Sequence, residues 1–123
     1  MKYLLLIYHN PESRRLWETF SDEQRAEGLQ TYAALNESLA ASGELIVTEA
    51  LADPSEAKTV RVTEDRTESS DGPFAETKEQ LAGFYLVDAE TMDRAVEIAA
   101  SIPEASLGLI EVRPILTYSG LEM

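Results

Sequence analysis

The segment DGPFAETKEQLAGFY, residues 71–85, passes from a tight turn through a charged run into an apolar strand. Gly72 accepts positive φ because it has no Cβ, and Pro73 fixes its own φ while keeping Gly72 out of the helical region. This turn predicts a defined position for Phe74 and for the charged residues that follow it. We expect residues 82–88 to form a buried strand directly after them.

Two segments of the chain are apolar on both faces of the strand that each predicts. In residues 2–8 and again in residues 84–87, alternate side chains point to opposite faces. Two helices can cover only one face of a sheet, so the other face would be left to water as an apolar patch. We therefore expect a symmetric homodimer with the sheets face to face. In the first strand Tyr3, Leu5 and Ile7 lie opposite Leu4, Leu6 and Tyr8, and in the second Phe84 and Leu86 lie opposite Tyr85 and Val87.

The hydrophobic periodicity predicts one domain, residues 1–123, with the order β-α-β, an inserted hairpin and β-α-β. Ser21 and Gln24 form a capping box for a helix over 22–42 that Gly43 ends. A second helix follows Thr91 and ends at Pro103. Right-handed crossovers give a ferredoxin-like antiparallel sheet with both helices on one face. The remaining segments are strands at 44–51, 82–88 and 107–116, a hairpin within 53–73, and a connection at 12–20 with a helical turn.

The composition excludes several classes of function. A net charge of −13 repels phosphate backbones and anionic lipid, so we expect neither nucleic-acid nor membrane partners. The chain has no cysteine, which excludes disulfides and thiolate chemistry, and one histidine, which excludes a multi-histidine metal site within one subunit. No nucleotide-binding motif is present, so we expect no cofactor. The six apolar residues at 3–8 are too few for a secretory signal, which predicts a cytoplasmic protein.

Three segments resemble the YCII-related family in its DGPF-type branch. They are the opening strand at 1–8, the block at 71–81, which is the most specific, and the closing strand at 110–114. The resemblance implies a dimeric α+β barrel, and it names a family of enzyme-like proteins without fixing a reaction. Relatives carry a proposed active-site histidine on the first helix, paired with an aspartate. Counting back from Gly43, this chain has Tyr32 at that place.

The DGPF block supplies several candidate site residues. Asp71 is either a carboxylate at a pocket mouth, as general base or anchor, or a cap of the turn that bonds nearby backbone N–H groups. Phe74 is placed by the same turn. Glu76 and Lys78 share a face if the segment is extended. They are therefore either a solvated ion pair or a site in which Lys78 binds an anionic group.

Two further candidates lie outside that block. His9 follows the first strand, and as the single imidazole it is suited to acid–base chemistry near neutral pH, although a lone histidine in a loop is more often a surface residue. Arg113 shares a strand face with Glu111, so it either forms a structural ion pair or clamps a carboxylate.

These residues support two interpretations of function. The first is a cofactor-independent enzyme with a small-molecule pocket bordered by Asp71, Phe74 and Tyr32, in which His9 or Asp71 performs catalysis and Lys78 or Arg113 supplies positive charge. The second is a non-catalytic dimer that binds a small molecule or a protein. Genes of the family often adjoin those of extracytoplasmic-function sigma factors, which implies a regulatory role for such a dimer.

Overall fold

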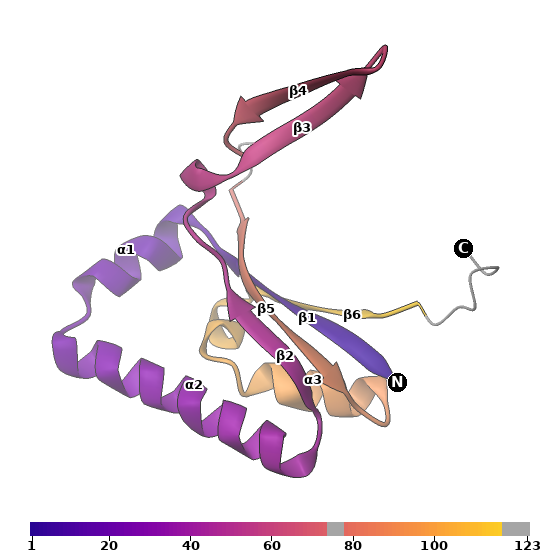
Figure 1. Cartoon of the computed structure of the whole chain (residues 1–123). Helices are drawn as coiled ribbons and strands as arrows, with labels where there is room; N and C mark the ends of the chain where they lie inside the picture. The colour runs from indigo at the N-terminus through magenta and orange to yellow at the C-terminus, as the bar shows by residue number, and fades with distance from the viewer. Residues whose placement is uncertain (74–77, 117–123) are drawn as a thin grey trace.

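The computed structural model describes residues 1–73 and 78–116 of the chain. Four strands form an antiparallel sheet in the order β2-β5-β1-β6, with β1 and β5 in the centre (Figure 1). This order, with helical crossovers between β1 and β2 and between β5 and β6, is the ferredoxin-like arrangement that the periodicity predicts. The strands are β1 (Lys2–His9), β2 (Leu45–Ala50), β5 (Gln80–Asp88) and β6 (Ile110–Pro114).

The helices confirm two predictions and correct a third. Helix α2 (Asp22–Ser42) starts at a Ser21–Gln24 capping box and ends at Gly43, whose φ is 81°. Helix α3 (Met92–Ala100) follows its Thr91 cap. Residues 12–20 were expected as a connection with a helical turn, but all of them except Phe20 belong to helix α1 (Pro11–Thr19), because Asn10 and Ser13 form a second capping box around Pro11. The predicted strand at 107–116 is shorter, since residues 103–107 form the 3-10 helix η2 (Pro103–Leu107).

The hydrophobic core lies between the sheet and the helices. Alternate residues of β1 and β5 point into it, and α3 covers them with three buried side chains. Helix α2 contributes less, since Leu39 is the buried residue among its 21 positions. The core thus depends mainly on the two central strands and α3. Its buried members are Tyr3, Leu5, Ile7, Leu39, Tyr85, Val87, Ala89, Ala95, Ile98, Ala99 and Ile102.

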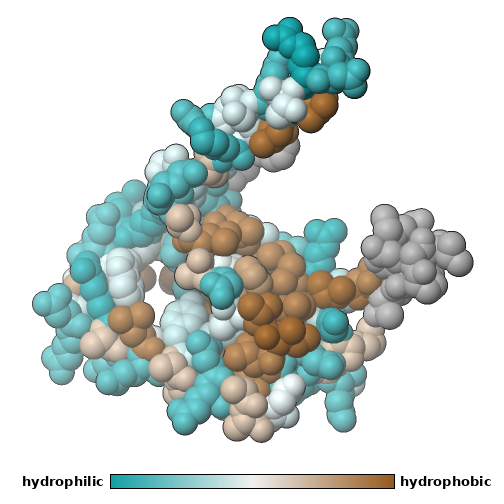
Figure 2. All heavy atoms as spheres, in the orientation of Figure 1, coloured by the Kyte–Doolittle hydropathy of each residue, from teal (hydrophilic) through white to brown (hydrophobic). Residues whose placement is uncertain are grey.

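The opposite face of the sheet is open. Leu4 pairs with Leu86 and Leu6 with Phe84, and all four side chains remain partly exposed. Val47 lies opposite Leu86 on the neighbouring strand. Figure 2 shows an apolar patch over these strands. The alternation predicted from the sequence is therefore present, with one face buried under helices and the other open in the single chain. We call Leu4, Leu6, Val47, Phe84 and Leu86 the open face.

An inserted hairpin, which we call the arm, projects from one end of the sheet (Figure 1). Its strands are β3 (Lys58–Thr63) and β4 (Arg66–Asp71), joined by a two-residue turn in which Glu64 and Asp65 have positive φ. The 3-10 helix η1 (Pro54–Glu56) leads into it. At its base the Gly72 N–H donates to the Ala57 carbonyl at 2.7 Å. Gly72 has a φ of 93°, as the turn sequence predicts.

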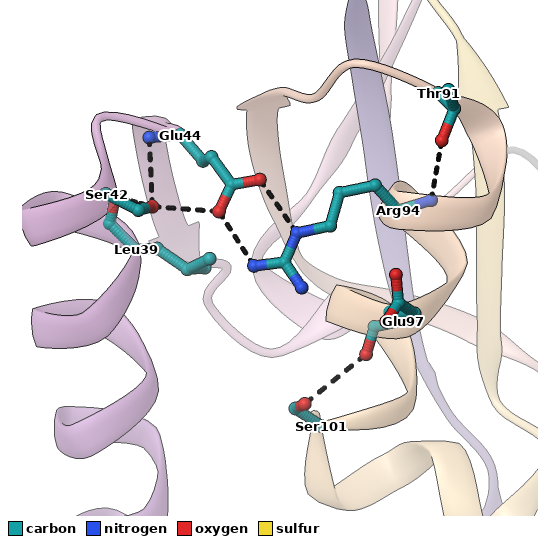
Figure 3. A network of polar contacts seen from close by, with 7 residues as sticks. All are labelled: Leu39, Ser42, Glu44, Thr91, Arg94, Glu97 and Ser101. Carbon is teal, nitrogen blue, oxygen red and sulfur yellow. Dashed lines mark hydrogen bonds and ion pairs between the residues drawn. The ribbon is translucent and has the colours of Figure 1, made fainter.

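An ion pair joins the start of β2 to helix α3 (Figure 3). The Arg94 Nε donates to Glu44 Oε2 at 2.9 Å, and Nη2 donates to Oε1 at 2.8 Å. The Ser42 hydroxyl adds a third hydrogen bond to the same carboxylate at 2.8 Å. These bonds, led by the one from Arg94, lower the pKa of the Glu44 carboxyl to about 2. The carboxylate therefore remains charged at neutral pH and fixes the end of α2 relative to α3.

Across the described ranges, we find no helix that combines the length and the apolar character needed to cross a membrane.

Candidate functional site

Three polar side chains from distant parts of the chain meet beside the sheet. The Tyr32 hydroxyl, on α2, donates to the Glu104 carboxylate on η2, at 2.7 Å from Oε2. The Nε2 of His9, at the end of β1, lies 3.8 Å from the same Oε2. The His9 side chain is 41% exposed and that of Glu104 only 16%. We call His9, Tyr32 and Glu104 the candidate site.

Local features of three elements place these side chains. The register of β1 against β5 shifts between Ile7 and Tyr8, and such bulges redirect the side chains that follow. His9 is thereby presented at the strand end. Pro103 occupies the first turn of η2, where its missing N–H costs nothing, and Glu104 follows it. Tyr32 lies one helical turn after Gly28 on the same side of α2.

The environment of Glu104 favours its charged form. Burial alone would raise the pKa of this carboxyl, but the nearby His9 imidazole and the hydrogen bond from Tyr32 outweigh burial and leave the pKa below its ordinary value. Glu104 is therefore a carboxylate at neutral pH. A partly buried carboxylate beside an imidazole restricts the orientation of the ring.

Tyr32 acts on this site as a hydrogen-bond donor. Burial, followed by its hydrogen bond to the Glu104 carboxylate, raises the pKa of the Tyr32 phenol far above its ordinary value. The phenol consequently stays protonated and cannot accept a proton from a substrate. Its hydrogen bond fixes the Glu104 carboxylate.

A second polar contact supports the first. The Tyr85 hydroxyl, on the central strand β5, donates to Oδ1 of Asn36, one turn after Tyr32 on α2. Burial raises the pKa of the Tyr85 phenol, so it also remains a donor. The contact joins α2 to the sheet close to the candidate site. Because Tyr85 is almost fully buried, this hydrogen bond forms where water cannot replace it.

Two open hollows lie on either side of η2. The first, about 510 Å³, lies between α1 and the residues after η2, and includes Asn10, the neighbour of His9. The second, about 540 Å³, lies between the first half of α2 and η2, and includes Pro103 and Ser106, on either side of Glu104. Both hollows are lined by neighbours of the candidate site in the chain, and neither lining includes His9, Tyr32 or Glu104. The first hollow is lined by Asn10, Glu12, Ser13, Arg15, Leu16, Thr19, Leu107 and Leu109. The second is lined by Phe20, Gln24, Glu27, Gly28, Thr31, Ala100, Ser101, Ile102, Pro103 and Ser106.

The structure brings together two of the residues predicted from the sequence, His9 and Tyr32, through Glu104. Asp71 lies instead at the base of the arm, where its Oδ1 accepts from Lys58 Nζ at 3.0 Å in solvent. Lys78 is exposed just before β5. Phe74 and Glu76 lie outside the described residues.

Arg113 lies on the opposite face of the sheet from the candidate site. It pairs with Leu4 on the open face, two residues from Glu111, which accepts a hydrogen bond from Tyr8 at 3.2 Å. Burial and the Glu111 charge raise the pKa of the Tyr8 phenol. Within the described ranges, no three His, Asp or Glu side chains are grouped to hold a metal ion.

Sequence reasoning missed Glu104. The helical pattern of α3 stops before Pro103, and no pattern in residues 103–107 shows that this segment turns back toward the end of β1. The one local signal was an acidic residue directly after a proline, which is typical of the first turn of a helix. That signal predicts a helical turn at Glu104 but does not identify the side chains that it contacts.

The fold and the candidate site define the chain as a small ferredoxin-like α+β domain. The YCII-related domain matches residues 1–119, and the chain belongs to this family. An uncharacterized protein of Rhizobium meliloti (strain 1021) is 35% identical over 125 residues, spanning 100% of this chain and 98% of its own length.

A solved structure of similar fold is that of TftG, a 5-chloro-2-hydroxyhydroquinone dehydrochlorinase from Burkholderia phenoliruptrix AC1100, in complex with 2,5-dihydroxybenzoquinone. The two chains align over 98% of each with a TM-score of 0.53 and 17% identity. At this identity the likeness concerns the fold alone.

Proposed function

We propose that this protein is a cofactor-independent enzyme that transfers a proton to or from a small molecule at His9. The observation that carries the proposal is the convergence of His9 and Tyr32 on the partly buried Glu104 carboxylate. The imidazole Nε2 faces Glu104, so Nδ1 is the nitrogen directed to a bound molecule. General acid–base catalysis needs such an oriented imidazole with access from solvent.

The division of roles follows from the protonation states. Glu104 is charged, Tyr32 is a protonated donor, and His9 is partly exposed. When a substrate gives its proton to Nδ1, the Glu104 carboxylate stabilises the imidazolium that forms, and the proton returns to product or solvent. The activity of TftG supports small-molecule chemistry on this fold, while its low identity leaves the substrate of this chain to experiment.

The single histidine makes the proposal directly testable. Proton–nitrogen NMR of the imidazole reports on His9 without overlap from other rings. We expect 2,5-dihydroxybenzoquinone, used as a first probe of a small-molecule library, or another member of that library, to shift the His9 signals. Glu104→Gln and Tyr32→Phe should weaken binding or turnover of the same compound, and Glu111→Gln on the other face is the control. A ligand that binds tightly without changing the His9 signals would contradict the proposed site.

We also propose that the protein is a homodimer whose open faces pack together. The support is the open face, whose five apolar residues on β1, β5 and β2 would face water in a monomer (Figure 2). Two copies related by a twofold axis would use the same surface twice. Sedimentation equilibrium tests this directly, and Leu86→Glu should convert the dimer to monomer.

A second candidate function is a non-catalytic binding dimer with a regulatory role linked to extracytoplasmic-function sigma factors. The feature that favours it is the polar cluster of Tyr8, Glu111 and Arg113 beside the open face, which could hold a ligand without involving His9. A ligand whose binding is abolished by Arg113→Ala and unaffected by His9→Gln would favour this second function over the first.

A further inference from the structure

The arm is built almost entirely of exposed residues. Among residues 58–71, Thr59 alone is not exposed. A two-stranded hairpin is at best marginally stable in water unless its face packs against something else. Among residues 1–73 and 78–116, the arm therefore lacks a packing partner.

The base of the arm is nevertheless fixed. Lys58 and Asp71 pair across its two strands at 3.0 Å, next to the Gly72–Ala57 backbone bond. Asp53, just before η1, accepts from Arg14 of α1 at 3.0 Å. These contacts anchor the arm at the end of the sheet, so it points in a set direction.

One side of the arm is apolar. Val60 and Val62 are 60% and 66% exposed, and they pair with Ser69 and Thr67. Paired residues of antiparallel strands share a face, and successive residues alternate. Arg61 and Glu68 therefore lie on the opposite side. The apolar side of the arm and the open face are both visible from one direction in Figure 2.

The charges of the arm favour another copy of the same chain as its partner. The chain carries a net charge of −13, so two copies repel each other. Three of its ten basic residues, Lys58, Arg61 and Arg66, lie within the arm. Against them stand four acidic residues, Glu64, Asp65, Glu68 and Asp71, so the arm itself carries a net charge of −1 and adds little to the repulsion between two copies.

We propose that the Val60 and Val62 face of the arm packs against a second copy of this chain and extends the interface between the two open faces. The inference rests on the homodimer proposed above. A partner that approaches the open face meets the apolar side of the arm from the same direction. By symmetry, the arms of both copies contribute to the same interface.

The test is sedimentation equilibrium of the full chain at micromolar concentrations. The double variant Val60→Asp/Val62→Asp should raise the dimer Kd at least tenfold, since four charges would enter apolar contacts in the dimer. The double variant Thr59→Asp/Thr63→Asp adds the same charge to the same strand on its other side and should leave the Kd within twofold of the wild type. Val60→Thr/Val62→Thr keeps residues that favour strands, and should weaken the dimer by an intermediate factor.

Each outcome separates the arm from the dimer itself. A wild-type dimer that Leu86→Glu dissociates, with equal Kd values for the two aspartate variants, overturns the role of the arm and leaves the open-face dimer standing. A wild-type chain that sediments as a monomer overturns both. The proposal is also contradicted if the threonine variant leaves the dimer Kd unchanged while the Val→Asp variant raises it strongly. The added charge, and not the loss of apolar contact, would then explain the weaker dimer.

Discussion

Replacing Glu44 by glutamine should destabilise the protein at neutral pH. The substitution keeps the shape of the side chain and removes the charge that receives two hydrogen bonds from Arg94, at 2.9 and 2.8 Å (Figure 3). Charge-assisted bonds contribute about 1.5–3 kcal/mol when protected, and exposed ion pairs about 0.2–1 kcal/mol. The Glu44 side chain is 17% exposed and Arg94 42%, which lies between these cases. We expect a loss of about 1–2 kcal/mol in the free energy of unfolding.

The effect should depend on pH with a defined sign. The pKa of Glu44 falls from 4.5 to about 2 on folding, so the contribution is complete well above pH 4.5 and is lost as the pH falls toward 2. At pH 3, about two fifths of it should remain, from the populations that these two pKa values give. Urea unfolding of wild type and Glu44→Gln at pH 7 and pH 3 measures the difference.

Two comparisons make this prediction specific. Arg94→Lys keeps the positive charge and loses the planar fork, so it should lose part of the same free energy. Glu97→Gln, on the same helix, is the control and should change stability by less than about 0.5 kcal/mol. Equal stabilities of wild type and Glu44→Gln at pH 7, or a difference that does not shrink at pH 3, would refute the reasoning.

Four further substitutions test the packing and the backbone conformation. Gly83→Ala should lower the free energy of unfolding by about 1–3 kcal/mol, because the new Cβ would lie 2.9 Å from the Glu49 carbonyl oxygen on β2. Gly28→Ala should instead stabilise α2 by about 0.5–1 kcal/mol, since its Cβ would meet the Trp17 ring at 3.8 Å. Thermal unfolding that ranks the two variants in the opposite order contradicts the spacing of β5 and β2. Gly72→Ala places a side chain at a φ of 93° with open space around it, so we expect a backbone strain of about 1 kcal/mol, and an unchanged melting temperature would show that the turn is not strained. Tyr85→Phe leaves Asn36 without its donor and should cost about 1–2 kcal/mol in urea unfolding, with no loss if Asn36 finds another partner.

The fold could be predicted because its signals are local. The Ser21–Gln24 capping box and Gly43 predict the first and last residues of α2 correctly. The alternation in residues 2–8 predicts the buried and open faces of β1. Residues 12–20 were expected only as a connection with a helical turn, because a proline can follow the end of a strand as well as begin a helix; here Pro11 follows an Asn cap and begins α1. Local sequence patterns therefore predict most helices and strands, and they remain ambiguous where a residue such as proline can either end one element or begin the next.

The candidate site was only partly predictable for a different reason. His9 was selected for its chemistry and Tyr32 by resemblance, and each was assigned a separate role. Their connection is Glu104, which follows His9 by 95 positions, and such a contact depends on how η2 returns to the sheet. Residue spacing carries no signal for a contact of that length. Roles for Asp71, Lys78 and Arg113 in ligand binding remain predictions, since these residues lie on other surfaces of the chain.

The pairing of β1 has a consequence for synthesis on the ribosome. The first strand to emerge is bonded on one side to β5, with Lys2 opposite Asp88, and on the other to β6, with Ile7 opposite Ile110. Its apolar side chains therefore remain unpaired until β5 and β6 have left the exit tunnel. During that interval β1 is the segment on which a chaperone has most reason to act, because exposed strand edges of nascent chains aggregate. The sheet should be complete only once β6 has also emerged and paired beside β1.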